Sequence, residues 1–512
     1  MTAKETAAQG PAWVMRYFNP FRPPAFRAPK VAIALPIALL SGCVAVPDLG
    51  PRPALRSAGT VAAQQSLPAS PDGAWPGEGW WSRFGDPQLD GLIAEALRDS
   101  PDVAAAAARL RRAAAQAQEA GAPLLPRLDA QGSAGLEKQS FNNGFPEQFT
   151  ALLPQGWEDR AQISAGLGYD LDLWGRNHAA LAAATSEARA AAIETGQVRL
   201  TLTTGIALAY ADLARLFDAR DNRQAALDLR LATARLVGAR EANGLETRGS
   251  LRQAEAQVAS ARADLGAAEE ALALRRHQIA ALVGAGPDRG LAITRPSLAA
   301  PTQAGLPADV TTDLIGRRPD IAAARARAEA ASRRVKVARA DFFPAIRLNA
   351  LIGLQSLGIG NLFESASVFG NVGPAVSLPL FHGGALSGRY RGARAGYDEA
   401  VASYDKAVIG AYQQAADAVT AQRLVGQRLA DTRAALAAQE EAYAIARLRY
   451  DGGLSTYLDV LAVEDRLLQA RLAASEVSSL ARTADIGLIR ALGGGYEPAM
   501  PAAGPSGEHP DE

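Results

Sequence analysis

The sequence predicts a mainly α-helical chain that also carries transmembrane β-strands. Three observations support this fold class: helical stretches of unusual length, four segments of about ten residues in which apolar and polar side chains alternate, and an internal repeat that relates the two halves of the chain. A soluble helical bundle would account for the helices but would leave the four strands unexplained.

Composition excludes several classes of function. The chain has 512 residues, and its 48% of hydrophobic residues exclude global disorder. Lys and Arg together number 53, as do Asp and Glu, so the net charge is zero. Nucleic-acid binding needs a broad basic surface, and nothing in this composition suggests one. We therefore expect no nucleic-acid partner.

The N-terminus is typical of an export signal. Basic residues precede the apolar run Val31–Leu40, which is about half of the ~20 residues that span a bilayer as a helix. The sole cysteine, Cys43, follows in "LSGC". This segment resembles the lipobox of bacterial lipoproteins, whose cysteine becomes the acylated N-terminus. The alternative is an ordinary signal sequence with an incidental cysteine. We expect a mature chain that begins at Cys43 and continues as a loose Pro/Gly/Ala-rich tether.

An internal repeat organises the chain. Ser100–Leu136 aligns without gaps to Arg318–Leu354, with matching Pro-Asp, Pro and Gly-Leu positions. A duplication of this kind predicts two similar structural units.

The first strand of each unit lies inside the aligned segment. Apolar or small residues occupy every second position from 127 to 136 and again from 346 to 354. A second alternating segment follows in each unit, at Gln162–Trp174 and Asn371–Phe381. Segments of ~9 to 11 residues cross a bilayer in a tilted barrel, apolar side outward. The alternative is an ordinary soluble sheet, because soluble hairpins alternate too.

One chain cannot close such a barrel. Open sheet edges are not tolerated in lipid, where each unsatisfied backbone group costs several kcal/mol. Strands that span a membrane must therefore be shared between subunits. Two chains would give eight strands around a lumen filled by side chains, and three would give twelve, the smallest multiple with room for passage.

The helical stretches are too long for an ordinary globular domain. Asn177–Glu241 contains no proline, and about 65 residues at 1.5 Å each span roughly 100 Å. Apolar residues recur at heptad spacing, as in Leu202, Ile206, Ala209, Leu213 and Leu216, and in Val401, Tyr404, Val408, Ala411 and Ala415. We expect these helices to pack along one another in a coiled-coil or α-barrel arrangement.

The long helices turn back at two matching points. Asn243–Glu255 and Gly452–Glu464 share a Gly-Leu pair, Gly244-Leu245 in the first and Gly453-Leu454 in the second. Glycine permits the positive φ that a helix C-terminus requires. These points are at least hairpin tips, and a tip far from the membrane is also where a partner could dock.

No motif supports catalysis or metal binding. The four histidines, His178, His277, His382 and His509, are scattered and have no cysteine partners. The Gly-rich segment at 284–290 follows a helix and lacks a Walker lysine. We therefore expect no enzyme activity, no cofactor and no metal, and energy for any transport must come from a partner.

Taken together, the motifs resemble the TolC family of outer-membrane channels, in particular the NodT-like or OprM-like lipoprotein subunits of efflux systems. The motifs run in order along nearly the whole mature chain: "LSGC", "WWSRFGDPQLDGLIAEAL", "YDLDLWGR", "RRPDIAAARARAEAA", "FFPAIRL", "LPLFHGG", "RYDGGLSTYLDVL" and "RALGGG". Each motif alone is weak, but together they are highly specific.

The resemblance implies an architecture, a location and partners. The fold would be a TolC-like homotrimer, with four strands per chain in a shared twelve-stranded outer-membrane barrel that continues into a long periplasmic α-helical barrel. The channel would take drugs or other small molecules from an inner-membrane pump through a periplasmic adaptor, or membrane fusion protein. Cys43 would carry N-palmitoyl and S-diacylglycerol groups and anchor the chain in the outer membrane of a Gram-negative bacterium. The adaptor would contact Gly244, Leu245, Gly453 and Leu454.

The resemblance also implies a periplasmic gate at the tips, formed by Asp459 and Tyr450. The chain departs from some members of the family, with Ala462 in place of a second aspartate, Ser455 in place of an arginine and Ser250 at a position that can be acidic. Three Asp459 carboxylates around a threefold axis should favour cations or have a raised pKa. Equally, Asp459 could serve only as a favourable charge at a helix N-terminus.

Two other functions remain open. The same fold could serve type I protein secretion, which the lipobox and "YDLDLWGR" disfavour. A structural lipoprotein with a coiled-coil rod belongs to a different class, and trimer formation together with dependence on detergent would exclude it.

The expected segments follow from these elements. In chain order they are a lipoprotein signal peptide (1–42), a lipidated tether (43–79), a first equatorial and helical segment (80–126), a first strand pair (127–174), a first long helical hairpin (175–284), an equatorial linker (285–318), a second-repeat helix (319–344), a second strand pair (345–381), a second long helical hairpin (382–495) and a flexible tail (496–512).

Overall fold

The computed structural model describes residues 46–68, 73–142, 144, 146–299 and 305–497. The strands are β1 (Arg127–Glu137), β2 (Glu158–Leu171), β3 (Ala345–Leu357) and β4 (Val368–Ser377). The helices are α2 (Pro87–Asp99), α3 (Pro101–Gly121), α4 (Arg176–Ala242), α5 (Arg248–Leu282), α6 (Asp288–Leu291), α7 (Val310–Arg317), α8 (Pro319–Ala340), α9 (Ala385–Asp451) and α10 (Tyr457–Ala491).

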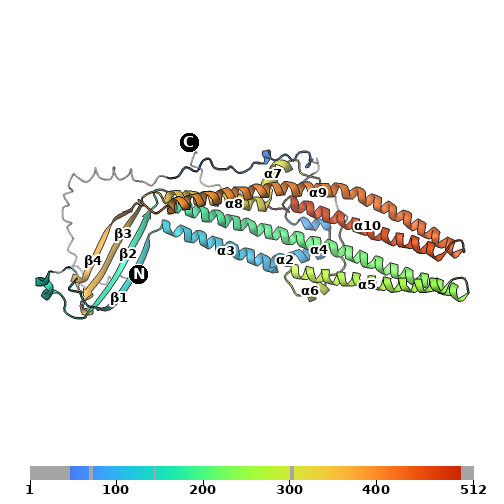
Figure 1. The fold of residues 1–512 in the computed structure, drawn as a ribbon, viewed down its shortest axis with the longest axis horizontal. Helices are drawn as coiled ribbons and strands as arrows, with labels where there is room; N and C mark the ends of the chain where they lie inside the picture. The colour runs from blue at the N-terminus through green and yellow to red at the C-terminus, as the bar shows by residue number, and fades with distance from the viewer. Residues whose placement is uncertain (1–45, 69–72, 143, 145, 300–304, 498–512) are drawn as a thin grey trace, which may run out of the picture.

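The molecule is elongated, with the sheet at one end and two helical hairpin tips at the other (Figure 1). Helix α4 has 67 residues and so has α9, while α5 and α10 have 35 each. At 1.5 Å per residue, the longer pair spans roughly 100 Å. The matched lengths reproduce the duplication, because α3, β1, β2, α4 and α5 correspond in order to α8, β3, β4, α9 and α10.

Within the described residues, four strands form one antiparallel sheet in the order β1-β2-β3-β4. Leu128 pairs with Leu167, Leu167 with Ala350, and Ala350 with Val372. The apolar positions of all four strands therefore lie on one face. β1 and β4 each pair on one side only among the described residues, so the sheet has two open edges.

Two strands differ at their ends from the predicted alternating segments. β2 begins at Glu158 and ends at Leu171, rather than spanning Gln162–Trp174. The chain leaves the strand there because the Asp172 carboxylate accepts hydrogen bonds from the backbone N–H groups of Asn177 (3.0 Å) and His178 (2.8 Å) at the beginning of α4. β4 ends at Ser377, before Pro379, rather than at Phe381.

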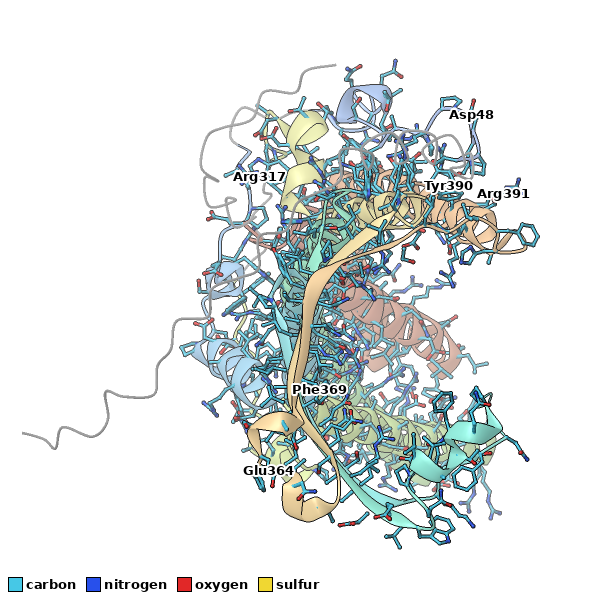
Figure 2. All side chains as sticks on the ribbon, turned by 90° about the vertical axis from the view of Figure 1, so that its left-hand side faces the viewer. Asp48, Arg317, Glu364, Phe369, Tyr390 and Arg391 are labelled. Carbon is cyan, nitrogen blue, oxygen red and sulfur yellow. The ribbon has the colours of Figure 1, made fainter. Side chains whose placement is uncertain are left out.

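An aromatic contact joins the two repeats where the sheet meets the helices. The Trp174 and Phe343 rings stack with their centroids 4.7 Å apart, and Trp174 Nε1 donates to the Pro344 carbonyl oxygen at 2.8 Å. Arg176 and Asp341 form an ion pair of 2.7 Å beside them. Seen from the sheet end (Figure 2), Glu364 and Phe369 lie along β4 and its loop, and Tyr390 lies at the beginning of α9.

The largest apolar core lies midway along the helices. Trp80, Phe84 and Ile93 pack against Ile206 and Tyr210 of α4. The buried Tyr210 hydroxyl donates to Asp86 Oδ2 at 2.7 Å. The "WWSRFGDPQL" motif thus fastens the N-terminal segment to the long helix. Among the described residues only α4 has the length and composition to cross a membrane, but 67% of its apolar window is buried inside the molecule, as expected of a core helix.

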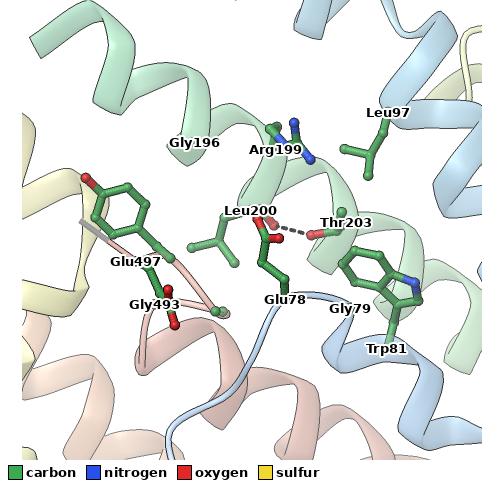
Figure 3. Close-up of a pocket in the computed structure, with 13 residues that line it drawn as sticks. Glu78, Gly79, Trp81, Leu97, Gly196, Arg199, Leu200, Thr203, Gly493 and Glu497 are labelled. Atoms are coloured by element: carbon green, nitrogen blue, oxygen red, sulfur yellow. Dashed lines mark hydrogen bonds between the residues drawn. The ribbon is translucent and has the colours of Figure 1, made fainter. Parts of the chain in front are cut away.

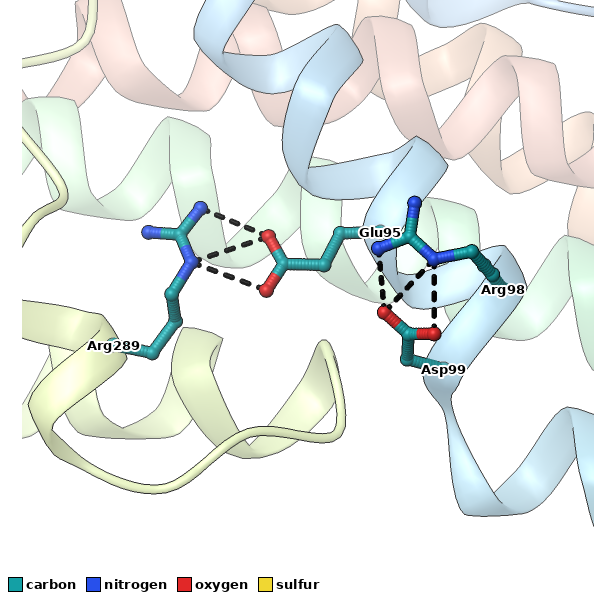
Figure 4. A network of polar contacts seen from close by, with 4 residues as sticks. All are labelled: Glu95, Arg98, Asp99 and Arg289. Atoms are coloured by element: carbon teal, nitrogen blue, oxygen red, sulfur yellow. Dashed lines mark hydrogen bonds and ion pairs between the residues drawn. The ribbon is translucent and has the colours of Figure 1, made fainter.

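Two arginine–carboxylate ion pairs lie in the same region (Figure 4). Glu95 of α2 accepts hydrogen bonds from Arg289 of α6, with Nε to Oε1 and Oε2 at 3.1 Å each and Nη2 to Oε2 at 2.9 Å. Arg98 pairs with its neighbour Asp99 at 2.6 Å. The first contact joins segments that are far apart in the sequence.

The N-terminal segment is docked along α9 rather than loose. Arg394 donates to the carbonyl oxygens of Gly50 and Pro51, and Tyr397 donates to that of Pro53 at 2.9 Å. Arg56 pairs with Asp405, about two turns beyond Tyr397 on α9. The expectation of a loose tether missed this because the contacts are made by backbone carbonyls, which any sequence supplies. Cys43 lies outside the described residues.

Candidate functional site

The two hairpin tips have the same backbone conformation. Gly244 has φ +74° and Gly453 has φ +71°, as glycine at a helix C-terminus allows. Leu245 N–H donates to the Arg240 carbonyl at 2.8 Å, and Leu454 N–H donates to the Arg449 carbonyl at 2.8 Å. Leu245 and Leu454 are 66% and 74% exposed. Each tip therefore presents an exposed apolar side chain at the end furthest from the sheet.

Asp459 and Thr456 form a capping box at the N-terminus of α10. Its carboxylate accepts hydrogen bonds from the Thr456 backbone N–H and hydroxyl, both at 2.8 Å, and Asp459 N–H donates back to Thr456 Oγ1 at 3.4 Å. These hydrogen bonds lower the pKa of Asp459. In the single chain the carboxylate is exposed and has a local role as a helix cap.

Tyr450 ties the second hairpin to the first. Its side chain is buried, and its hydroxyl donates to Glu246 Oε1 in the first tip at 3.1 Å. The Arg240 guanidinium lies 4.7 Å from the centre of the Tyr450 ring and donates to the Tyr450 carbonyl oxygen at 3.3 Å. Burial, followed by the Glu246 carboxylate, raises the pKa of Tyr450 to about 12.

A small apolar cluster surrounds this contact and involves all four tip helices. Val237 of α4 and Ala254 of α5 pack with Tyr450 of α9 and with Tyr457 and Val460 of α10. The family resemblance implies that Asp459 and Tyr450 form a gate. In the single chain they have different surroundings, since Asp459 is an exposed helix cap and Tyr450 is buried between the hairpins.

A buried charged group lies behind the tip, and the sequence reasoning missed it. Arg230 of α4 is 5% exposed and Glu464 of α10 is fully buried, and Arg230 Nε lies 3.0 Å from Glu464 Oε1. Arg230 also pairs with the more exposed Asp465, and Thr233 donates a long hydrogen bond to Glu464. We call Arg230, Glu464 and Asp465 the cross-repeat triad, because it joins a first-repeat helix to a second-repeat helix.

Burial raises the pKa of Glu464, and Arg230 opposes that rise. The Arg230 Nη1 atom and the Tyr457 hydroxyl are buried without a hydrogen-bond partner among the described residues. The sequence did carry a signal for this group. Arg230 and Glu464 each occupy a core position in an apolar helical stripe, beside Leu227 and Leu461 respectively.

A cavity of about 660 Å³ lies beside the end of α10 (Figure 3). The wall includes Glu78, Arg199 and the turn Gly493–Gly495. The Thr203 hydroxyl in this wall donates to the Leu200 carbonyl at 3.2 Å. Gly495 has φ +80°, and a Cβ there would lie 2.3 Å from the Gly77 carbonyl oxygen. The "RALGGG" motif thus allows several segments to cross closely.

The part of the chain that the structure describes holds no group of three or more His, Cys, Asp or Glu side chains that could bind a metal ion. At and behind the tips, Asp459 caps a helix, Arg240 lies over an aromatic ring and Arg230 forms an ion pair. This arrangement can hold two hairpins together or release them.

Comparisons with known proteins agree with this architecture. A sequence model of the outer membrane efflux protein family matches residues 92–285 and 310–494. The pyoverdine export outer membrane protein OpmQ of Pseudomonas aeruginosa is 32% identical, over 90% of this chain and 97% of its own length. The multidrug resistance outer membrane protein MdtP of Escherichia coli (strain CFT073) is 31% identical, over 90% of this chain and 95% of its own.

Solved structures show the same fold. The crystal structure of the outer membrane protein VceC from Vibrio cholerae superposes with a TM-score of 0.78 and 43% sequence identity, covering 83% of this chain and all (100%) of that one. The mainly helical fold class with a four-stranded sheet is thereby confirmed as TolC-like.

Proposed function

Because the chain belongs to the outer membrane efflux protein family, we propose that it is the outer-membrane channel of a tripartite efflux system. It would be a passive duct that carries drugs or other small molecules from an inner-membrane pump and a periplasmic adaptor to the exterior. The observation that carries this proposal is a sheet with one apolar face and two open edges, joined directly to helices roughly 100 Å long.

The open edges argue for a homotrimer. β1 and β4 would each leave a row of backbone N–H and C=O groups unpaired in lipid. Pairing β4 of one copy with β1 of the next satisfies both edges at once and repeats around an axis. Three copies give twelve strands, which is enough for a lumen with room for passage.

The exposed leucines support docking of the adaptor at the tips. Leu245 and Leu454 are largely exposed at positions where the helices turn back. The left-handed Gly244 and Gly453 fix the direction of each turn. Both tips have the same geometry, so an adaptor with a repeated binding surface could contact each of them in the same way.

A lipid on Cys43 would complete the attachment to the outer membrane. The docked segment from Gly50 to Arg56 runs along α9, and Arg394, its first contact, lies nine residues after the start of α9. That path leads toward the junction of the sheet and the helices, so acyl chains on Cys43 would reach the bilayer that surrounds the sheet. The proposed groups are N-palmitoyl and S-diacylglycerol.

We place the gate at the tips. Tyr450, through Glu246 and Arg240, and the cross-repeat triad each join the first hairpin to the second. Their release would let the hairpins separate. The exposed Asp459 carboxylate would face its two symmetry copies if the tips converge on the trimer axis. The relatives OpmQ and MdtP are named for pyoverdine export and multidrug resistance, which favours small molecules over proteins as cargo.

The test is complementation in cells that keep a cognate pump and adaptor but lack their outer-membrane channel. Expression of the chain should lower the accumulation of a fluorescent pump substrate. Changing Leu245 and Leu454 together to Asp should abolish this effect, whereas the matched change of Leu291, which is 68% exposed on α6, should not. Unchanged accumulation with the wild-type chain would overturn the proposal.

A further inference from the structure

The face of the sheet opposite the apolar one carries almost all of its charge. Among the described strand residues, only Asp159 places a charged side chain on the apolar side. The others alternate onto the second face by register, since Asp170 pairs with Arg347 and Arg127 with Gly168. In a closed barrel with its apolar face in lipid, this second face lines the lumen.

The charges on this lumenal face form two groups. One lies at the end nearest the helices and consists of Arg127, Asp129, Asp170 and Arg347. The other lies at the far end and consists of Glu137, Glu158 and Arg160. Between them the described lumenal positions are uncharged, namely Gln131, Ser133, Gly135, Gln162, Ser164, Gly166, Gly168, Asn349, Leu351, Gly353, Gln355, Phe369, Asn371, Gly373 and Ala375.

Each arginine on this face is paired with a carboxylate. Arg347 Nε lies 2.5 Å from Asp170 Oδ1 across β3 and β2. Arg160 Nη1 lies 2.5 Å from Glu137 Oε2 across β2 and β1, and Arg127 Nε lies 2.5 Å from Asp129 Oδ2 within β1.

These ion pairs are exposed to solvent. Their side chains are between 34% and 81% exposed, and exposed pairs of this kind add little to stability. Their main physical consequence is therefore on the electric field inside the lumen. A carboxylate with an adjacent guanidinium presents a dipole, whose field falls off faster with distance than that of a bare charge.

We propose that the barrel lumen is charge-compensated, so that it carries cations, anions and zwitterions with nearly equal ease, and that Arg347 and Arg160 determine this lack of selectivity by neutralising Asp170 and Glu137. This inference rests on the proposed channel function. At the helical end two arginines balance two aspartates, and at the far end one arginine faces two glutamates. Only a weak cation preference at the far end remains.

The test measures ion selectivity of the full-length purified trimer in planar bilayers, from the reversal potential in a KCl gradient. Arg347→Gln leaves three unpaired Asp170 carboxylates around the lumen, and the potassium-to-chloride permeability ratio should rise about threefold. Asp170→Asn leaves three unpaired arginines and should shift the ratio toward chloride. The double variant removes both charges and should return the ratio to the wild-type value.

Arg98→Gln is the matched control, because it removes the same charge from an exposed ion pair on α2, away from the sheet. Repeating the series with Asp459→Ala separates any contribution of the tips. A conducting channel whose ratio stays the same in both single variants would overturn the charge-compensated lumen and leave the channel function intact. A wild-type protein that does not conduct would overturn the channel function itself.

Discussion

Single residues at the tips divide into exposed caps and buried bridges. Asp459 is hydrogen-bonded to Thr456 at the surface, whereas Glu464 is fully buried beside Arg230. Replacing a buried ion pair by apolar residues is often neutral for stability, but removing one partner is costly. The two groups should therefore respond differently to substitution and to pH.

Asp459 can be tested as a gate separately from its role as a cap. Thr456→Ala removes the capping side chain, at a cost of about 1 kcal/mol to the helix, and keeps the carboxylate. Asp459→Asn keeps the shape and removes the charge. If a ring of carboxylates controls the tip, only Asp459→Asn should raise passive antibiotic influx, measured as increased susceptibility. Equal effects of the two variants would leave Asp459 as a helix cap only.

Glu464 should make stability depend on pH. Because burial raises its pKa above the unfolded value, the stability it contributes is complete below the ordinary glutamate pKa of about 4.3. That stability is lost as pH rises through the raised pKa. The melting temperature of Glu464→Gln, relative to the wild type, should therefore rise as pH increases above about 4.

The control for this series is Glu440→Gln, which changes a half-exposed carboxylate paired with Arg471 across the same hairpin. It should show no such trend. Melting temperatures of wild type and Glu464→Gln that stay parallel across the pH range would contradict the account.

The sequence predicted the tips but not the cross-repeat triad, for a physical reason. Gly244 and Gly453 can be recognised in the sequence because a helix C-terminus favours a residue in the left-handed conformation, which glycine adopts easily. Arg230 and Glu464 become meaningful only when α4 and α10 pack together. A charged residue in an apolar stripe shows that a partner is needed, but not which one.

At the scale of elements, the sheet carries its apolar side chains on one face and nearly all of its charged side chains on the other. Val372 lies on the apolar face in the same rung as Leu128 and is 86% exposed. The residue before it, Asn371, lies on the lumenal face. A charge on the lipid face of a barrel costs about 2 to 4 kcal/mol near the midplane.

Val372→Arg should therefore reduce the amount of trimer in the outer membrane, measured by cell fractionation and unheated gel electrophoresis. Asn371→Arg, one residue away, should leave assembly unchanged because its side chain stays in water. Equal loss of assembly in both variants would show that the face assignment is wrong.

The alternation was sufficient to predict the strands, because a period of two requires no knowledge of the partner strand. The ends of β2 and β4 were less predictable. Leu173 continues the alternation, yet Asp172 caps α4 and ends the strand before it. The docking of residues 50–56 on α9 could not be predicted either, since tyrosine and arginine side chains there bind backbone carbonyls.

At the scale of the whole molecule, duplication explains the shape. Two copies of one unit give a sheet with two free edges at one end and two tips of equal geometry at the other (Figure 1). Among the described residues, a single chain of this shape leaves the apolar face of its sheet and its tip leucines exposed, and β1 and β4 each pair on one side only. Each of these surfaces is explained if three copies share one barrel and an adaptor covers the tips.

The most direct test of the shared barrel is single-channel conductance of the detergent-purified protein in a planar bilayer, with the oligomer mass determined on the same sample. The account predicts discrete conductance steps from a species of three chains. A monomer without conductance would mean that the four strands form a soluble sheet, and it would contradict the proposed channel.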